Sequence, residues 1–421
     1  MPHLEYLSRN QFGYKKNTSC KSAFFVVNET LQFYRSGGSN CHVVSLDASK
    51  AFDKLWRSGL FYKLIEWTDS STWRLLHNYY SKSFVSVVVD GVQSGIFRTR
   101  EGVKQGGILS PDLFNFFMDK LLDECMSLGV GALLGKLNTS ALAYCDDFIL
   151  LSSSVCDMQK LLSCCLSYAV DWKLAFNPNK SVSYSLGRSA CLHLGATPIP
   201  QTDGFVYLGL PIGGDSYVEQ FFREKMSKCE KALYALGSIG CKPHNLHPKA
   251  IAFVYKQYCQ SIIRYGLEFI YLKKGFVNQL NVRQSILVKC VLGVKYYSRS
   301  KPLLNELSVE QIGQIYDKHK VYGLKQCMNN ILTRDILEYL SKYYSISGAP
   351  KNSFVSQLGQ VIRTDDIVLS NYAGILQNID SNFACNDLEL RENVRSILNG
   401  FKVLDSFCWV HQLNDVLKII F

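Results

Sequence analysis

The chain has 421 residues, 47% of them hydrophobic and 19% charged, and this balance excludes a mainly disordered protein. Its formal net charge is +11, and residues 217–300 alone carry 14 basic against 4 acidic side chains. A concentrated basic segment attracts a polyanion, most often nucleic acid, although an ordinary solvated helical surface has the same composition.

The cysteines and the apolar runs indicate the compartment. The chain has 15 cysteines and no C-x-x-C pair, which fits a reducing environment. No uncharged apolar run approaches the roughly 18 residues of a membrane span, and the first residues lack the apolar core of a secretory signal. We therefore expect an intracellular protein, in the nucleus or the cytoplasm, with no membrane partner.

The first half of the chain has a mixed helix and strand pattern. A β-branched run predicts a buried strand at 42–48, and a helix is expected over 51–67. Asp90-Gly91 between two β-rich runs predicts a hairpin. Pro111 opens an amphipathic helix with Ser110 as its N-cap. Further along, a strand pair is expected at 141–152, a helix at 157–173 and a short strand pair or a turn at 205–212.

The pattern changes after Gly213-Gly214, where apolar residues begin to recur every three or four positions. This predicts a mostly helical second half, divided from the first near residue 214. Ser308 and Gln311 have the spacing of a capping box. The helices are expected from 218, from Pro248 to about 265, and at 278–294, 308–330 and 386–398.

Three carboxylates carry the most information about chemistry. Asp146 and Asp147 are adjacent and lie between two apolar arms, an arrangement that is costly because like charges repel near groups that prefer burial. Alone, this pair is most simply an Asp-Asp turn. Asp47 also ends an apolar strand, and oxygen ligands on neighbouring strands would suit Mg²⁺. Two such ions would clamp the attacking and leaving oxygens of a phosphoryl displacement.

Six segments, in order over about 200 residues, resemble the motifs of non-LTR retrotransposon (LINE-like) reverse transcriptases. Two of them contain the carboxylates, and a third contains a Gln-Gly pair followed by Leu-Ser-Pro. The segments are QFGYKKNTSCKSAFF (11–25), LDASKAFDKL (46–55), EGVKQGGILSPDLFNFFMDKL (101–121), AYCDDFILLS (143–152), LAFNPNKS (174–181) and FVYLGLPI (205–212).

The resemblance implies an α+β fold with a right-hand polymerase palm, in which helices pack on an antiparallel sheet. Partial fingers, a helical thumb and a helical C-terminal region would complete it. The implied domains are a remnant of the fingers at 1–40, the palm at 41–214, the basic thumb at 215–300, and a C-terminal region of unknown role at 301–421.

The resemblance also implies roles for individual residues. Asp47, Asp146 and Asp147 would be the catalytic metal ligands for two Mg²⁺ ions, with Mn²⁺ as an alternative. Nucleotide-binding residues would be Ala51, Phe52 as a steric gate against ribonucleotides, Gln105, Gly106 and Lys180. Arg223, Lys225 and Lys228, on the first basic helix, would hold the nucleic-acid backbone.

The implied function is RNA-directed DNA synthesis, with an RNA template, a DNA primer and dNTPs as partners. Because only 46 residues precede Asp47, we expect an N-terminally truncated and poorly active relative. The alternative is a catalytically inactive nucleic-acid-binding remnant, and a group II intron or retron type is a weaker possibility. Cys241, His244 and His247 provide only three candidate zinc ligands in a Pro-containing loop, so a solvated loop is expected there.

Overall fold

The computed structural model describes residues 7–238, 240–242 and 245–362. The chain divides into two compact units. Among the described residues, the first extends from 7 to 214 and also includes Cys327–Ile336, and the second contains residues 215–326 and 337–362. The domain roles assigned from the motifs remain predictions.

A four-stranded antiparallel sheet forms the centre of the first unit, in the order β10-β1-β9-β8. The strand expected at 42–48 is β1, and the strand pair expected around the two aspartates is β8 and β9. Apolar side chains on both faces of β1 and β9 are fully buried, which explains their almost continuous apolar sequences. The strands are β1 (Cys41–Asp47), β8 (Ala141–Tyr144), β9 (Asp147–Ser152) and β10 (Val182–Leu186).

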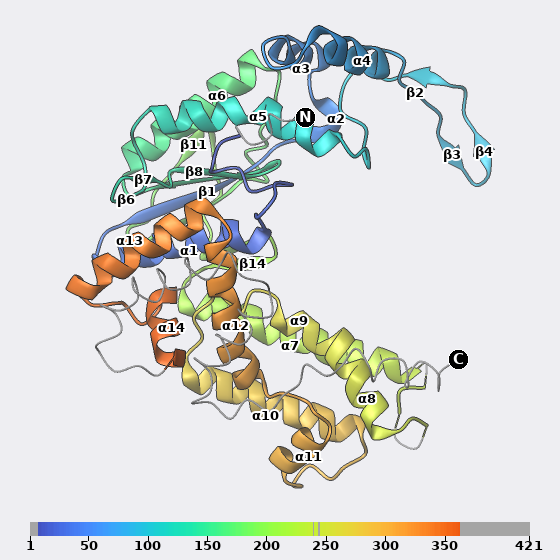
Figure 1. Ribbon diagram of the computed structural model, residues 1–421, viewed down its shortest axis with the longest axis vertical. Coiled ribbons are helices and arrows are strands. Elements are labelled where there is room, and N and C mark those ends of the chain that lie inside the picture. The colour runs from blue at the N-terminus through green and yellow to red at the C-terminus, as the bar shows by residue number, and fades with distance from the viewer. Residues whose placement is uncertain (1–6, 239, 243–244, 363–421) are drawn as a thin grey trace. The chain divides into compact units, whose positions relative to one another are not determined.

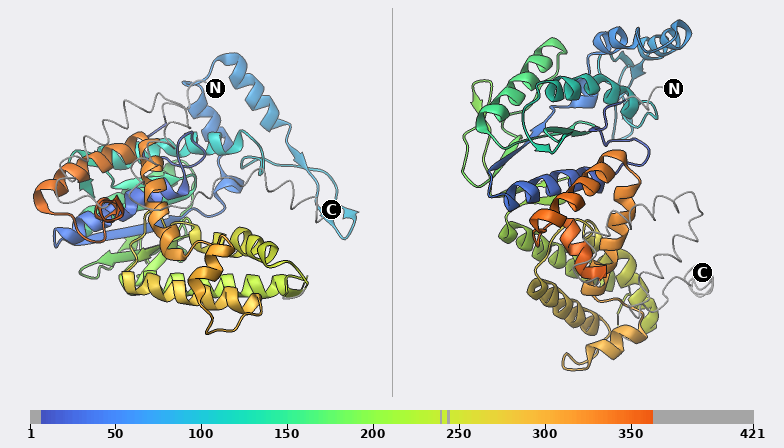
Figure 2. Two further views of the ribbon diagram at one scale, coloured as in Figure 1. Left: turned by 60° about the horizontal axis from the view of Figure 1, so that its bottom comes forward. Right: turned by 60° about the vertical axis from the view of Figure 1, so that its left-hand side comes forward.

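Helices cover both faces of this sheet (Figures 1 and 2). Val44, Leu46 and Phe148 share one core cluster with the apolar sides of α5 (Ser110–Ser127) and α6 (Val155–Asp171). On the opposite face lies α1 (Cys20–Ser36), which contacts β1 and β8. Ser19 begins α1, because its hydroxyl accepts a hydrogen bond from the backbone N–H of Ser22 at 3.1 Å.

Two sequence-based expectations for this unit were wrong. The helix predicted over 51–67 is broken into α2 (Ala51–Lys54) and α3 (Arg57–Leu64). The carbonyls of Phe52 and Leu55 accept hydrogen bonds from Val103 and Gly102 instead of from the next helical turn. Ser110 is the first residue of α5 rather than its N-cap, and its hydroxyl donates to the carbonyl of Lys104 at 2.5 Å.

Paired short strands make up the rest of the first unit. The predicted hairpin is confirmed: β3 pairs with β4 around Asp90 and Gly91, both at positive φ, and the flanking strands β2 and β5 pair with each other (β2, β3 and β4 are labelled in Figure 1). The strand pair expected at 205–212 is also confirmed, as β13 and β14. The remaining elements are α4 (Ser70–Ser81), β2 (Phe84–Val85), β3 (Val88–Val89), β4 (Val92–Gln93), β5 (Phe97–Arg98), β6 (Leu133–Leu134), β7 (Leu137–Asn138), β11 (His193–Leu194), β12 (Thr197–Pro198), β13 (Gly204–Tyr207) and β14 (Leu210–Gly213).

The second unit is helical throughout its described residues, as the apolar spacing predicted. The long first helix and the helix beginning at Pro248 are both present, and the latter contains one π-helical turn. The elements after residue 214, of which the end of α12 and the start of α13 belong to the first unit, are α7 (Asp215–Ser238), α8 (Pro248–Val254), η2 (Tyr255–Cys259), α9 (Gln260–Arg264), α10 (Lys274–Val291), α11 (Ser300–Glu306), α12 (Ile312–Met328), α13 (Ile331–Ser347) and α14 (Phe354–Ile362).

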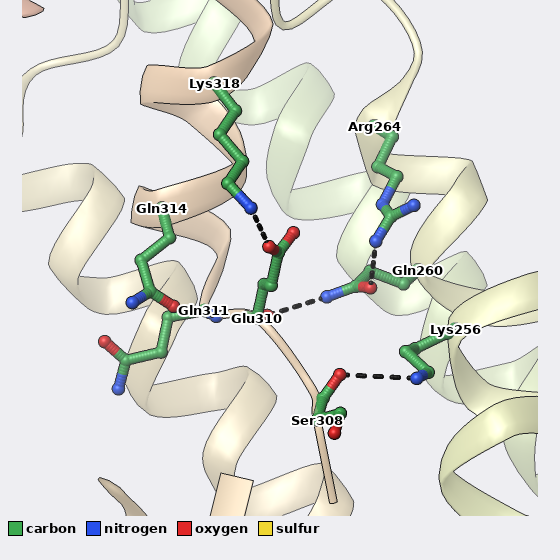
Figure 3. Close-up of polar contacts among 8 residues, drawn as sticks. All are labelled: Lys256, Gln260, Arg264, Ser308, Glu310, Gln311, Gln314 and Lys318. Atoms are coloured by element: carbon green, nitrogen blue, oxygen red, sulfur yellow. Dashed lines mark hydrogen bonds and ion pairs between the residues drawn. The ribbon is translucent and has the colours of Figure 1, made fainter. Parts of the chain in front are cut away.

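The loop between α11 and α12 is held by side chains of the π-helical region (Figure 3). Lys256 donates to the carbonyl of Ser308 at 3.3 Å, and Gln260 donates to the carbonyl of Glu310 at 2.9 Å. The predicted capping box is wrong, because Ser308 has a φ of 52° and α12 begins only at Ile312. Instead, the side-chain oxygen of Gln284 accepts from the Ile312 N–H at 3.0 Å.

The remaining expectations concern membrane-spanning helices and the last helix predicted in the chain. Within the described ranges, none of the helices is both long and apolar enough to cross a bilayer. The helix predicted at 386–398 lies outside the described residues.

Candidate active site

The β-sheet register brings two of the predicted carboxylates face to face. Asp47, the last residue of β1, is the Cα partner of Asp147, the first residue of β9. On its other side Asp147 is paired with Tyr144 of β8. Between these two lies a two-residue turn, Cys145-Asp146, in which Cys145 has a φ of 59°. The hairpin therefore presents Asp146 at its tip, beside the Asp47–Asp147 pair.

The three carboxylates influence one another electrostatically. Burial raises the pKa of Asp147 to about 6, and the negative charges of Asp146 and Asp47 contribute to the same shift. Burial also raises the pKa of Asp146, and Asp47 adds to it. Raised pKa values show that negative charge is disfavoured here, as expected when several carboxylates share one strand end. A cation bound at this point would relieve the repulsion.

The donor set suits a hard divalent ion, since all three groups are carboxylates on facing strand ends. In the described part of the chain, however, no three His, Cys, Asp or Glu side chains lie close enough together to form a preformed metal site. The fit therefore rests on the chemistry of the ligands and on the opposed backbone positions of Asp47 and Asp147.

Gln11 is part of this site, although its segment, 11–25, was predicted only as a motif with no role for this residue. Its side chain is fully buried, and its Oε1 accepts hydrogen bonds from the Cys145 N–H at 3.0 Å and the Gly13 N–H at 2.9 Å. Phe12 donates through its backbone to Ala143 at 2.8 Å, so residues 10–13 lie along β8. The Gln-x-Gly spacing was the available signal.

Residues predicted to contact the nucleotide lie on segments around the end of β1. Ala51 is buried in the core, whereas Phe52 is half-buried and its ring stacks on Phe114. Gln105 and Gly106 are exposed, and Gln105 donates to the Asp53 carboxylate at 2.7 Å. Gly106 has a φ of 76°, a conformation that favours glycine.

Lys180 is exposed, in a turn that is tied to Asp47. The Asn177 N–H donates to the Asp47 carbonyl at 2.8 Å, and the Asp47 N–H donates to the Ser181 hydroxyl at 3.1 Å. These two hydrogen bonds flank Lys180 in the sequence. The lysine is therefore carried on a turn anchored at the same residue that supplies one of the carboxylates.

The three predicted nucleic-acid contacts on α7 do not have the same environment. Lys228 is exposed, as the prediction requires. Arg223 is exposed but bonded to Gln279 at 3.2 Å. Lys225 differs from the expectation, because it is buried and its ammonium donates to the carbonyl of Tyr265 at 3.0 Å. Its charge is used inside the helical unit rather than presented to a ligand.

The loop that carries the three candidate zinc ligands is not solvated at each of its described residues. Cys241 is buried, burial raises the pKa of its thiol, and His247 caps α8 by accepting from the Lys249 N–H. His244 lies outside the described residues.

Comparison with known proteins identifies the family to which this arrangement belongs. The family described as "Reverse transcriptase (RNA-dependent DNA polymerase)" matches residues 1–212, which contain all three carboxylates and the Gln11 segment. The chain belongs to the reverse transcriptase family. The predicted resemblance and the palm fold that it implied are therefore confirmed.

The similar curated proteins come from non-LTR retrotransposons. The chain is 29% identical over 214 residues to the Pol polyprotein of the type-2 retrotransposable element R2DM of Drosophila melanogaster, which covers 48% of this chain and 20% of that protein. It is 23% identical over 285 residues to the RNA-directed DNA polymerase from mobile element jockey of Drosophila funebris, covering 64% and 30% respectively. The chain thus spans less than a third of the length of these two relatives.

The solved structures that match this chain include telomerases. Apo telomerase from Candida tropicalis matches with a TM-score of 0.38 and 11% identity, covering 88% of this chain and 58% of that one. A form truncated from the C-terminal domain matches with a TM-score of 0.36 and 14% identity, covering 49% and 39%. Likeness at this level carries no argument about function.

Proposed function

We propose that this chain is an RNA-directed DNA polymerase of the non-LTR retrotransposon type, which extends a DNA primer on an RNA template with dNTPs. The observation that supports this most directly is the pairing of Asp47 with Asp147 across β1 and β9, with Asp146 in the adjoining turn. In this family the corresponding motifs supply the metal ligands.

In the proposed mechanism, Asp47, Asp146 and Asp147 hold two Mg²⁺ ions, or Mn²⁺ in their place. When bound, such ions activate a primer 3′-hydroxyl and stabilise the pyrophosphate leaving group. Asp146 and Asp147, whose raised pKa values indicate that their negative charges are disfavoured, would be stabilised in the ionised form by holding such ions.

The neighbouring residues act on the nucleotide. Phe52 excludes the 2′-hydroxyl of a ribonucleotide, Gln105 and Gly106 contact the incoming nucleotide and the template, and Lys180 neutralises charge on the triphosphate. Support for the last role comes from the turn that carries Lys180, since its residues Asn177 and Ser181 are hydrogen-bonded to the backbone of Asp47. Positioning and charge stabilisation of this kind account for most of the rate in phosphoryl transfer.

A primer-extension assay tests the proposal. Purified chain, an RNA template, a DNA primer and dNTPs should give Mg²⁺-dependent incorporation that is lost in Asp146→Asn. Asp90→Asn is the matched control, because Asp90 is exposed and lies in the turn between β3 and β4, where Asn is equally well accommodated. Binding of the template–primer without incorporation, in wild type and variant alike, would instead identify a catalytically inactive nucleic-acid-binding remnant.

A further inference from the structure

The turn that presents Asp146 has a backbone conformation that it would not adopt readily by itself. Cys145 has a φ of 59°, in the left-handed region, which is unfavourable for a residue with a Cβ. Such a residue keeps this conformation only when its surroundings hold it there. The contacts that hold the Cys145 backbone therefore also set the position of Asp146, the next residue in the turn.

Two contacts from the segment before α1 meet at this turn, and a third contact, from α5, fixes that segment. Gln11 Oε1 accepts from the Cys145 N–H at 3.0 Å, and both groups are buried. Gly13 lies so close that a Cβ added to it would be 2.5 Å from the Cys145 nitrogen. Asn115 of α5 fixes Gly13 in turn, because its Nδ2 donates to the Gly13 carbonyl at 2.7 Å.

Gln11 is itself held firmly enough to transmit this constraint. Its side chain has no solvent exposure. On either side of it in the sequence, the Asn10 carbonyl accepts from the Ala143 N–H at 3.0 Å and the Phe12 N–H donates to the Ala143 carbonyl at 2.8 Å. These backbone hydrogen bonds align Gln11 with Ala143 of β8, and Ala143 lies two residues before Cys145.

We propose that Gln11 is a positioning residue for the polymerase reaction, which fixes the Asp146 carboxylate by holding the backbone N–H of Cys145. It touches neither substrate nor metal and acts through the turn. The inference rests on the proposed function for its catalytic consequence, but not for its structural one. A metal site needs its ligands within a fraction of an ångström of the required geometry. Mutation of a residue that holds a ligand in place, without touching the metal, typically costs about 10- to 100-fold in metal affinity.

The test compares Gln11→Met with a matched control, Gln32→Met. Methionine has nearly the size of glutamine but cannot accept the two N–H groups. Gln32 is half-buried on α1 and donates to Asn28, so its replacement measures a general cost of losing a glutamine in this unit. Both variants are measured at a temperature at which circular dichroism shows each to be fully folded.

Two readouts do not depend on activity. Amide hydrogen exchange at Cys145 should become at least tenfold faster in Gln11→Met and stay unchanged in Gln32→Met. Mn²⁺ binding, followed by electron paramagnetic resonance of the free ion, should weaken roughly tenfold in Gln11→Met only. Unchanged exchange at Cys145 in folded Gln11→Met would overturn the inference.

The kinetic readout separates positioning from loss of stability. In primer extension, Gln11→Met should lower kcat on the order of 100-fold while KM for dNTP stays within about twofold. If wild type incorporates no nucleotide, the proposed function fails, and the exchange and Mn²⁺ measurements still decide the role of Gln11. If Gln11→Met does not fold, Gln11→Asn replaces it: this side chain is one methylene too short to reach Cys145, so wild-type exchange and Mn²⁺ affinity would overturn the inference.

Discussion

The ring of Phe52 lies almost parallel to that of Phe114, with 4.7 Å between the ring centroids and 17° between the ring planes. Because Phe114 is fully buried on α5, this stacking fixes the direction in which the half-buried Phe52 points. A steric gate requires a ring held in this way, since a mobile ring would move aside for a 2′-hydroxyl.

Phe52→Ala should therefore raise the use of rNTPs relative to dNTPs at least tenfold, and it should lower the free energy of unfolding by about 1–3 kcal/mol through lost packing. The ratio of kcat/KM values for a matched dNTP and rNTP measures the first effect. Phe97→Ala, at an exposed position of β5, is the control. A wild-type sugar preference in Phe52→Ala would show that the ring serves only the core.

The buried ammonium of Lys63 should make the free energy of unfolding depend on pH. Its ammonium lies 3.8 Å from the ring centroid of Trp172 and donates to the Phe117 carbonyl at 2.7 Å. Burial lowers the pKa of Lys63 to about 7, and the nearby charge of Lys120 contributes. Between that value and the ordinary pKa of 10.5, the unfolded chain binds more protons than the folded one.

The free energy of unfolding contributed by this group should accordingly rise as pH increases from about 7 to 10, by at most about 1.4 kcal/mol per pH unit. Lys63→Met should flatten this rise, measured by urea unfolding at a series of pH values. Lys54→Met, at an exposed position, should leave the pH dependence as it is in wild type. An equal slope in Lys63→Met and wild type would contradict the role assigned to Lys63.

On the basic helix α7, we expect Lys228 to contribute to nucleic-acid binding and Lys225 to the stability of the fold. Lys228→Glu should weaken binding to an RNA–DNA duplex, and it should reduce the slope of log affinity against log salt by roughly 0.9 if one phosphate contact is lost. Fluorescence anisotropy at several salt concentrations measures both quantities. A slope identical to that of wild type would count against a phosphate contact at Lys228.

Lys225→Met should behave differently, because the ammonium of Lys225 is buried against Tyr265, Phe221 and Phe222. Its loss should reduce the free energy of unfolding by about 1–3 kcal/mol and leave the salt slope unchanged. Urea unfolding and the same anisotropy titration separate the two effects. A reduced salt slope in a fully folded Lys225→Met would restore this residue as a contact for nucleic acid.

Local patterns in the sequence were sufficient to predict most secondary-structure elements and to indicate the family. The strand before Asp47, the hairpin around Asp90-Gly91 and the strand pair around the two aspartates all follow from runs of β-branched residues and from turn chemistry. The helix predicted over 51–67 is interrupted by contacts with a distant part of the chain. The carbonyls that would continue the helix accept hydrogen bonds from the N–H groups of Gly102 and Val103, about fifty residues away.

The sequence by itself determined which carboxylates to consider, because charge between apolar strands is costly and its presence indicates a function. It could not determine that Asp47 is directly opposite Asp147, since register depends on how separate strands align. Nor could spacing along α7 reveal that Lys225 is buried while Lys228 is exposed, because that depends on where other helices pack. Only the tertiary structure brought Gln11 to the Cys145 N–H, through a backbone pairing between segments more than 130 residues apart.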